Sequence, residues 1–234
     1  MAKSLLFISD ISGFTEYIQE TEIEHSRNVI SELLEAMISA NTLNLKLAEI
    51  EGDALFFYLE NKIPSNDELM QQIKIMNTAF YNHLEVLKSK TKWSYKTHAN
   101  LDKLKLKIVA HSAELSFIKI HNIVKPFGKE VIEIHRLLKN SIKSKNYLLI
   151  TKQLANDMQI TTDYKNNLGH LEYGKDIYDG KEMIYLYSPI NVQRLNISYP
   201  TINESNNALK TNLKIHILEL LKNFFIPTTL YSYH

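Results

Sequence analysis

The chain has 234 residues, a length that suits one large domain, or one domain with an appendage, and that can bury a full hydrophobic core. Its composition is ordinary for a globular protein, with 44% hydrophobic and 23% charged residues, and a formal net charge of +1 gives no electrostatic basis for binding nucleic acid or an anionic membrane. The absence of cysteine excludes disulfides, thiolate metal sites and cysteine nucleophiles.

The sequence predicts no membrane span, because no apolar run approaches the ~20 residues that crossing a bilayer requires. Met1-Ala2-Lys3 leads directly into a strand-like segment, without the pattern of a signal peptide. We therefore expect a cytoplasmic protein.

The first half of the chain predicts alternating strands and helices. Residues 4–9 form a short apolar run typical of a buried strand, and Gly13 and Thr15 open a long helical pattern after it. Residues 43–50 and 54–59 predict two strands joined by a tight turn at Glu51-Gly52-Asp53. A second helix is expected over about 66–88, where Ser65 and Glu68 have the spacing of a capping box.

The second half continues the pattern after a polar stretch, 89–103, that we expect to be an exposed loop. The predicted elements are strands at 104–111 and 113–120, a loop at 121–127, a helix at 129–142, a strand at 147–151, a helix at 152–158, a strand at 182–188 and an amphipathic C-terminal helix at 208–225. This order fits an α+β fold with helices packed on an antiparallel-rich sheet. We expect one domain over residues 1–200, followed by a C-terminal amphipathic helix and tail over 201–234.

Two aspartates stand out because each lies at an end of an apolar run, beside a glycine. Asp10 belongs to FISDISGFT (7–15), and Asp53 belongs to EIEGDALFFY (49–58). Two carboxylates that strand ends bring together suit a hard divalent cation such as Mg²⁺ or Mn²⁺, which prefers oxygen ligands. The alternative is that these aspartates only cap a helix start and a hairpin turn, since aspartate serves both purposes.

The first motif resembles the F-x-D-I-x-G-F-T signature of class III nucleotidyl cyclases, and Gly52-Asp53 resembles the hairpin of the second metal aspartate in that family. The resemblance implies a ferredoxin-like cyclase fold. It also implies that Asp10, Asp53 and the backbone carbonyl of Ile11 hold the metal, and that Phe14 and Thr15 lie beside a nucleoside triphosphate. A third block, residues 108–112, resembles the strand of the family that ends in a histidine. The matching residue here is His111, and we expect its role to be structural.

A fourth block resembles the family's W-G-x-x-V-N-x-x-x-R pattern at the start of a helix, through Phe127-Gly128, Val131 and Arg136. The resemblance gives Arg136 the role of stabilising the triphosphate during catalysis. The asparagine that orients the ribose would stand four residues earlier, on the same helix face, where this chain has Ile132. Since one transition-state donor typically contributes ~10²–10³ in rate, we expect weak or absent turnover.

The positions that select the base in the family also differ here. Glu49 stands where adenylyl cyclases carry a lysine, as in guanylyl cyclases, and Lys125 stands at the partner position, so the two charges could neutralise each other. A late segment, residues 179–183, resembles the family's G-K-G-E segment and offers Lys181 as a phosphate contact.

Three functional hypotheses follow from this resemblance, which also extends to an uncharacterised branch of compact bacterial cyclase-like proteins. The first is a degenerate cyclase that binds a divalent metal and a nucleoside triphosphate in a signalling role. The second is an active cyclase with a non-adenine base preference. The third is a pseudoenzyme scaffold that binds no nucleotide. Class III sites combine the aspartates of one subunit with the asparagine and arginine of the other, so the resemblance also implies a homodimer.

Overall fold

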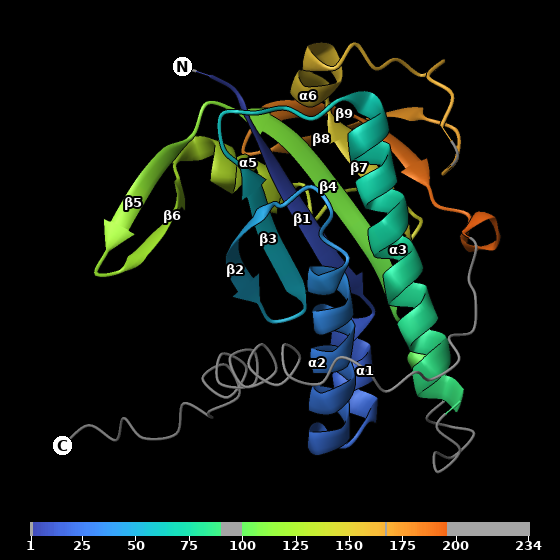
Figure 1. The fold of residues 1–234 in the computed structure, drawn as a ribbon. Coiled ribbons are helices and arrows are strands. Elements are labelled where there is room, and N and C mark those ends of the chain that lie inside the picture. Colours follow the sequence, from blue (N-terminus) through green and yellow to red (C-terminus); the bar gives the residue numbers. More distant parts are fainter. Residues whose placement is uncertain (1, 90–99, 167, 196–234) are drawn as a thin grey trace.

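The structure is a computed structural model, and it describes residues 2–89, 100–166 and 168–195 (Figure 1). A seven-stranded sheet has the order β2-β3-β1-β4-β7-β9-β8. All its neighbouring strands are antiparallel except β4 and β7. The strands are β1 (Ser4–Ser12), β2 (Lys46–Glu51), β3 (Ala54–Leu59), β4 (Lys105–Ala113), β7 (Tyr147–Thr151), β8 (Glu172–Tyr178) and β9 (Lys181–Pro189).

The helices lie on both faces of this sheet, and a two-stranded hairpin projects away from it (Figure 1). The helices are α1 (Phe14–Glu20), α2 (Ile23–Ser39), α3 (Asn66–Ser89), α5 (Lys129–Arg136) and α6 (Lys152–Asp157), and a 3₁₀ turn spans Val192–Arg194. The projecting hairpin consists of β5 (Ser116–Ile120) and β6 (Ile123–Phe127). The mixed α+β fold that the sequence predicts is therefore confirmed.

Strand β1 runs through the centre of the protein and is buried on both faces. Leu5 and Phe7 pack into the larger core, under α2 and α3, while Leu6 and Ile8 pack into a smaller core on the opposite face. Successive side chains of a strand point to opposite faces, so Asp10 lies on the same face as Leu6 and Ile8. This is the face that α5 covers, and we call it the α5 face.

Several helix boundaries differ from the predicted ones. The long first helix is divided at Thr21 and Glu22 into α1 and α2, and the predicted 129–142 helix ends at Arg136. The capping box is confirmed, because the Ser65 amide donates to the Glu68 carboxylate over 2.7 Å and the Glu68 amide donates to the Ser65 hydroxyl over 3.3 Å.

Two strands were absent from the prediction. The expected loop at 121–127 contains β6, and β8 was not predicted at all. The predicted C-terminal helix lies outside the described residues. Within the described ranges, no helix combines the length and the apolar character needed to cross a membrane.

Gly13 joins β1 to α1 in a conformation that side chains disfavour. Its φ is +86°, and a Cβ atom there would lie 2.5 Å from the carbonyl oxygen of Lys103. Gly180 has a similar φ of +76°, but a Cβ atom there would have no neighbour within 4 Å. Only at Gly13 therefore do both the backbone conformation and the packing require a glycine.

We expect Gly13→Ala to lower the free energy of unfolding by roughly 2–4 kcal/mol, because strain and a backbone clash act together. Gly180→Ala is the matched control, with strain alone, and should cost only about 1 kcal/mol. Urea denaturation of both variants measures the difference. Equal losses would show that the contact with Lys103 does not constrain the turn.

Candidate functional site

The two predicted metal aspartates lie next to each other at one end of the sheet. Asp10 is opposite Ala54 in the β1–β3 register, and Asp53 immediately precedes that residue in the β2–β3 turn. The amide of Ile11 donates to the carbonyl of Asp53 over 3.2 Å, which fixes the turn against the strand. The N-cap residue of α1 is Gly13, and no side chain caps this helix. Asp10 therefore does not cap the helix start, which was the alternative to metal binding.

A lysine that the sequence did not bring to attention pairs with the first aspartate. Lys107 of β4 is the register partner of Asp10 across the β1–β4 ladder. Its Nζ lies 3.1 Å from Oδ1 of Asp10, and it also donates to the carbonyl of Leu138 over 3.3 Å. The side chains of Lys107 and Asp10 are only 18% and 14% exposed, so water screens their attraction poorly.

Burial and nearby charges shift the pKa of both carboxylates. Burial raises the pKa of Asp10, although the charge of Lys107 opposes this shift. Burial and the neighbouring charge of Asp10 together raise the pKa of Asp53 to about 7. Two close carboxylates that resist joint ionisation form a site that favours a cation. Their oxygen donors therefore fit the hard divalent ion that the resemblance implies.

Beside Asp10 lies a hollow of about 690 Å³ between the sheet and α5, which we call the α5 hollow. Its lining residues are Asp10, Glu51, Lys107, Val131, Ile132, His135, Arg136, Leu138 and Lys139. Asp10 and Arg136 of one chain thus share a single hollow. Ile132 is 54% exposed, so an apolar side chain stands open to solvent at the position where an amide was expected.

His135 ties α5 to β2 at the side of this hollow. Its Nδ1 lies 2.6 Å from the carbonyl of Val131 and its Nε2 lies 2.9 Å from Oε1 of Glu51. Both partners only accept hydrogen bonds, which suits a ring that donates from both nitrogens. Burial disfavours the charged ring, but the bonds to Glu51 and Val131 outweigh it and raise the pKa of His135.

The cations that were predicted to contact phosphate are both paired within the chain. Arg136 contacts Asp179, in the β8–β9 turn, and Lys181 contacts Glu133 on α5. Lys181 is therefore held on the β9 side of α5, and the α5 hollow does not include it. Asp179, which the sequence analysis did not single out, thus neutralises the predicted catalytic arginine.

The predicted base-selecting residues also form an ion pair, as their opposite charges allowed. Nζ of Lys125 lies 2.7 Å from Oε2 of Glu49, joining β2 to β6. Both line a separate hollow of about 460 Å³ whose remaining lining is apolar. Phe14 packs partly buried against the larger core, Thr15 is exposed, and the side chain of Ile11 is buried.

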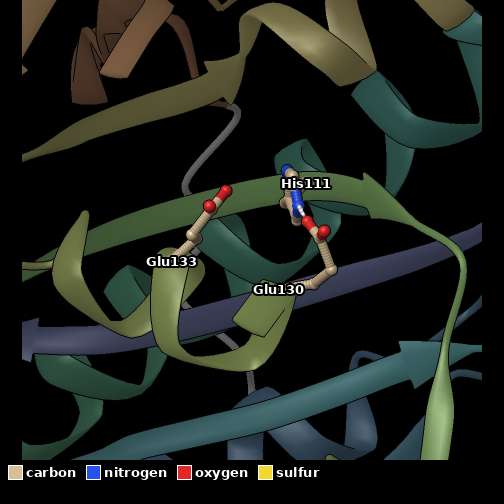
Figure 2. A group of neighbouring side chains, drawn as sticks. All are labelled: His111, Glu130 and Glu133. Atoms are coloured by element: carbon tan, nitrogen blue, oxygen red, sulfur yellow. Dashed lines mark hydrogen bonds and ion pairs between the residues drawn. The ribbon is translucent and has the colours of Figure 1, made fainter. Parts of the chain in front are cut away.

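His111, which the sequence indicated to be structural, anchors the first turn of α5. Figure 2 shows its ring against Glu130, with Glu133 one turn further along the same helix. Nε2 lies 2.9 Å from Oε2 of Glu130, and Nδ1 lies 2.9 Å from the hydroxyl of Thr151, which caps α6. The bond from His111 lowers the pKa of Glu130.

The same three residues could supply metal ligands, because one ligand atom from each lies within 4.8 Å of the others. Each side chain already has a partner, however. Glu130 accepts from His111, and Glu133 pairs with Lys181. The contacts of this cluster are thus those of a network that joins β4, α5 and α6.

Lys107, Glu51 and Asp179 are the residues of the site that sequence reasoning missed. Lys107 interrupts the apolar run of β4, between Leu106 and Ile108. A charged residue in an otherwise apolar strand signals a buried partner. Identifying Asp10 as that partner requires the β1–β4 register, which single-sequence periodicity does not provide.

Comparison with solved structures shows that the protein has the fold of class III nucleotidyl cyclase domains. The adenylyl cyclase CyaB from P. aeruginosa matches with a TM-score of 0.59 and 14% identity, over 81% of this chain and 94% of that one. The guanylyl cyclase Cya2 matches equally well, over 85% and 97%. The guanylate cyclase domain of RhGC from Catenaria anguillulae, solved with GTP, matches with a TM-score of 0.54 and 14% identity, over 81% and 97%.

The chain belongs to the family described as protein of unknown function (DUF2652), whose model matches residues 30–147. It is also similar to a Mycobacterium tuberculosis protein described as uncharacterized, Rv2561/Rv2562, with 32% identity over 128 residues. That match covers 54% of this chain and 58% of the relative, so the chain spans less than two thirds of the relative's length.

The raised pKa of Asp53 predicts a pH-dependent loss of stability. Because its pKa is about 7 in the folded state and about 4 in the unfolded chain, the carboxyl favours folding while protonated. That contribution is complete below about pH 4 and disappears as the pH rises to about 7. We expect Asp53→Asn to match the wild type at pH 4 and to exceed its free energy of unfolding by roughly 2–4 kcal/mol at pH 8.

Urea titrations at several pH values, with the exposed Asp163→Asn as control, measure this effect. If the pH profiles of Asp53→Asn and the wild type run parallel, the pKa of Asp53 is the same in the folded and the unfolded chain and the prediction is wrong.

Proposed function

We propose that this protein is a degenerate nucleotidyl cyclase that binds a divalent metal and a nucleoside triphosphate but cyclises the nucleotide slowly or not at all. Asp10 and Asp53, with the carbonyl of Ile11, hold Mg²⁺ or Mn²⁺. The nucleotide binds beside these aspartates, in contact with Phe14, Thr15, Glu49 and Lys125. The protein then serves a signalling or regulatory role in the cytoplasm, as a binder of nucleotide.

The adjacency of the two aspartates supports the metal site. Asp10 lies on β1 and Asp53 in the β2–β3 turn, both are partly buried, and burial together with the charge of Asp10 raises the pKa of Asp53. A divalent ion bound there would supply charge neutralisation and orientation for phosphate oxygens. Asp10 and Asp53 would then hold the metal, and with it the phosphate groups of the nucleotide, at the edge of the α5 hollow.

The observation that carries the proposal of degeneracy is the state of α5. Ile132 cannot donate a hydrogen bond to a ribose, and both Arg136 and Lys181 are already paired with carboxylates of the chain. To contact a triphosphate, each cation has to leave its partner. Two weakened donors and one absent donor together predict a loss of several orders of magnitude in turnover.

Calorimetric titration with Mn²⁺ and each of the four nucleoside triphosphates tests binding, with Asp10→Ala as the variant that lacks a ligand. We expect heats in the wild type that Asp10→Ala abolishes. His111→Ala should leave them unchanged, which distinguishes the aspartate pair from the His111 cluster. A wild type that binds no nucleotide would support the scaffold alternative instead.

Mass analysis of the same mixtures for cyclic products tests turnover. We expect no product above that of Asp10→Ala, and a gain from Ile132→Asn, since the amide restores a ribose donor. Efficient cyclisation by the wild type that disappears in Asp53→Ala would establish the active-cyclase alternative.

The resemblance to class III cyclases also implies a second copy of the chain, although Asp10 and Arg136 of one chain line the same hollow. Exposed apolar side chains lie on the β5–β6 hairpin and in the first turn of α5, and together we call them the hairpin surface. They include Ile120 (56%), Ile123 (65%), Phe127 (61%) and Ile132 (54%). We propose that this surface forms a homodimer in which Arg136 of one subunit approaches Asp10 and Asp53 of the other.

Light scattering of the full chain tests this dimer. We expect a dimeric mass for the wild type and a monomeric mass for Ile123→Glu, because a buried unpaired charge opposes association. Ile177→Glu is the matched control, since Ile177 is 71% exposed on β8, at the opposite edge of the sheet from β2. A wild-type monomer, or equal behaviour of the two variants, would contradict the proposal.

A further inference from the structure

We propose that Lys107 is a built-in competitor for the divalent metal, so that an ion reaches the aspartate pair only by displacing the lysine from Asp10. This inference rests on the metal site of the proposed function and adds a residue that sets its affinity. The Nζ of Lys107 lies 3.1 Å from Oδ1 of Asp10, so the lysine already supplies this carboxylate with a positive charge.

The backbone places Lys107 there, and its side chain has little choice of position. In the β1–β4 ladder its Cα lies opposite that of Asp10, and both side chains are on the α5 face. A second contact, to the carbonyl of Leu138 over 3.3 Å, holds the ammonium from the helix side. The lysine is thus fixed from two elements and directed at the carboxylate.

Other charges of the site cannot substitute for this role. Arg136 is paired with Asp179, and His135 is bonded to Glu51. Among the described residues, Lys107 alone forms an ion pair with Asp10. Removing Lys107 therefore leaves two neighbouring carboxylates with no cation between them, which strengthens their attraction for a metal.

The hollow beside Asp10 gives the displaced lysine a place to go. Lys107 lines this space of about 690 Å³, together with Glu51. When a metal takes Asp10, the flexible side chain of Lys107 can turn into the hollow. The cost of breaking its two contacts is then subtracted from the affinity of the metal.

A calorimetric titration of the whole chain with Mn²⁺ alone tests this competition, and it does not require any enzymatic activity. We expect Lys107→Met, which keeps the length of the side chain but removes its charge, to bind Mn²⁺ at least about tenfold more tightly than the wild type. Mn²⁺ should also raise the melting temperature of this variant more than that of the wild type.

Lys105→Met is the matched control. Lys105 lies two residues earlier on β4, is similarly half-buried and faces Ser12 in the register. The substitution Lys105→Met removes the same charge from the same strand face without touching Asp10, so we expect the affinity for Mn²⁺ to change by less than about twofold. Lys107→Arg keeps the positive charge and should bind Mn²⁺ as weakly as the wild type. Lys107→Gln, which also removes the charge, replaces Lys107→Met as the test if the latter fails to fold.

The outcomes separate this inference from the proposed function. If Lys107→Met and the wild type bind Mn²⁺ equally, or if Lys107→Arg binds far more tightly than the wild type, Lys107 does not compete and only this inference fails. If a folded Lys107→Met binds no Mn²⁺, or if Asp10→Asn added to Lys107→Met leaves binding intact, the metal site itself is wrong and the inference fails with it.

Discussion

The antiparallel pairing of β1 with β4 is the constraint on which the rest of the site depends. It extends over nine residue pairs, from Ser4 opposite Ala113 to Ser12 opposite Lys105, through the centre of the sheet. A shift by one residue would move every side chain to the other face. The same register therefore determines which side chains enter each hydrophobic layer and places Lys107 beside Asp10. A change of register would alter both features together.

Charge compensation within the chain is the second theme of the site. Asp10, Glu49, Arg136 and Lys181 each have an oppositely charged partner, supplied by a different element in every case. Cations that hold such partners are less available to a ligand than free ones. A ligand that contacts Arg136 or Lys181 therefore has to displace a carboxylate of the chain first.

The sequence predicted the fold well where one face or both faces of an element are buried. Strand β1, the β2–β3 hairpin and α3 were found because their apolar periodicity and capping residues are clear. Strand β8 was missed because its side chains are alternately exposed and half-buried, without a large apolar member in the core. Strand β6 was missed because Pro126 and the exposed Ile123 and Val124 resemble a loop.

The candidate site was predictable only in part, and for a physical reason. Asp10, Asp53 and Arg136 belong to local motifs that a single segment reveals. Lys107, Glu51 and Asp179 matter through ion-pair partners that are at least 43 positions away in the sequence. Glu51, for example, lies two residues before Asp53 but is bonded to His135. Such partners follow from strand register and helix placement, which local patterns do not determine.

The attachment of α5 has a consequence for how the protein responds to ionic strength. This helix has eight residues, too few to be stable by itself. It is held by the burial of Ile134 and Leu137 and by the bonds of Glu130 to His111 and of His135 to Glu51. On the β8–β9 side it is held by the ion pairs Arg136–Asp179 and Glu133–Lys181. Three of the four side chains in these two pairs are at least 40% exposed, so salt screens the pairs while leaving the buried side chains in place. Rising salt should therefore loosen the β8–β9 side of α5 before the sheet responds.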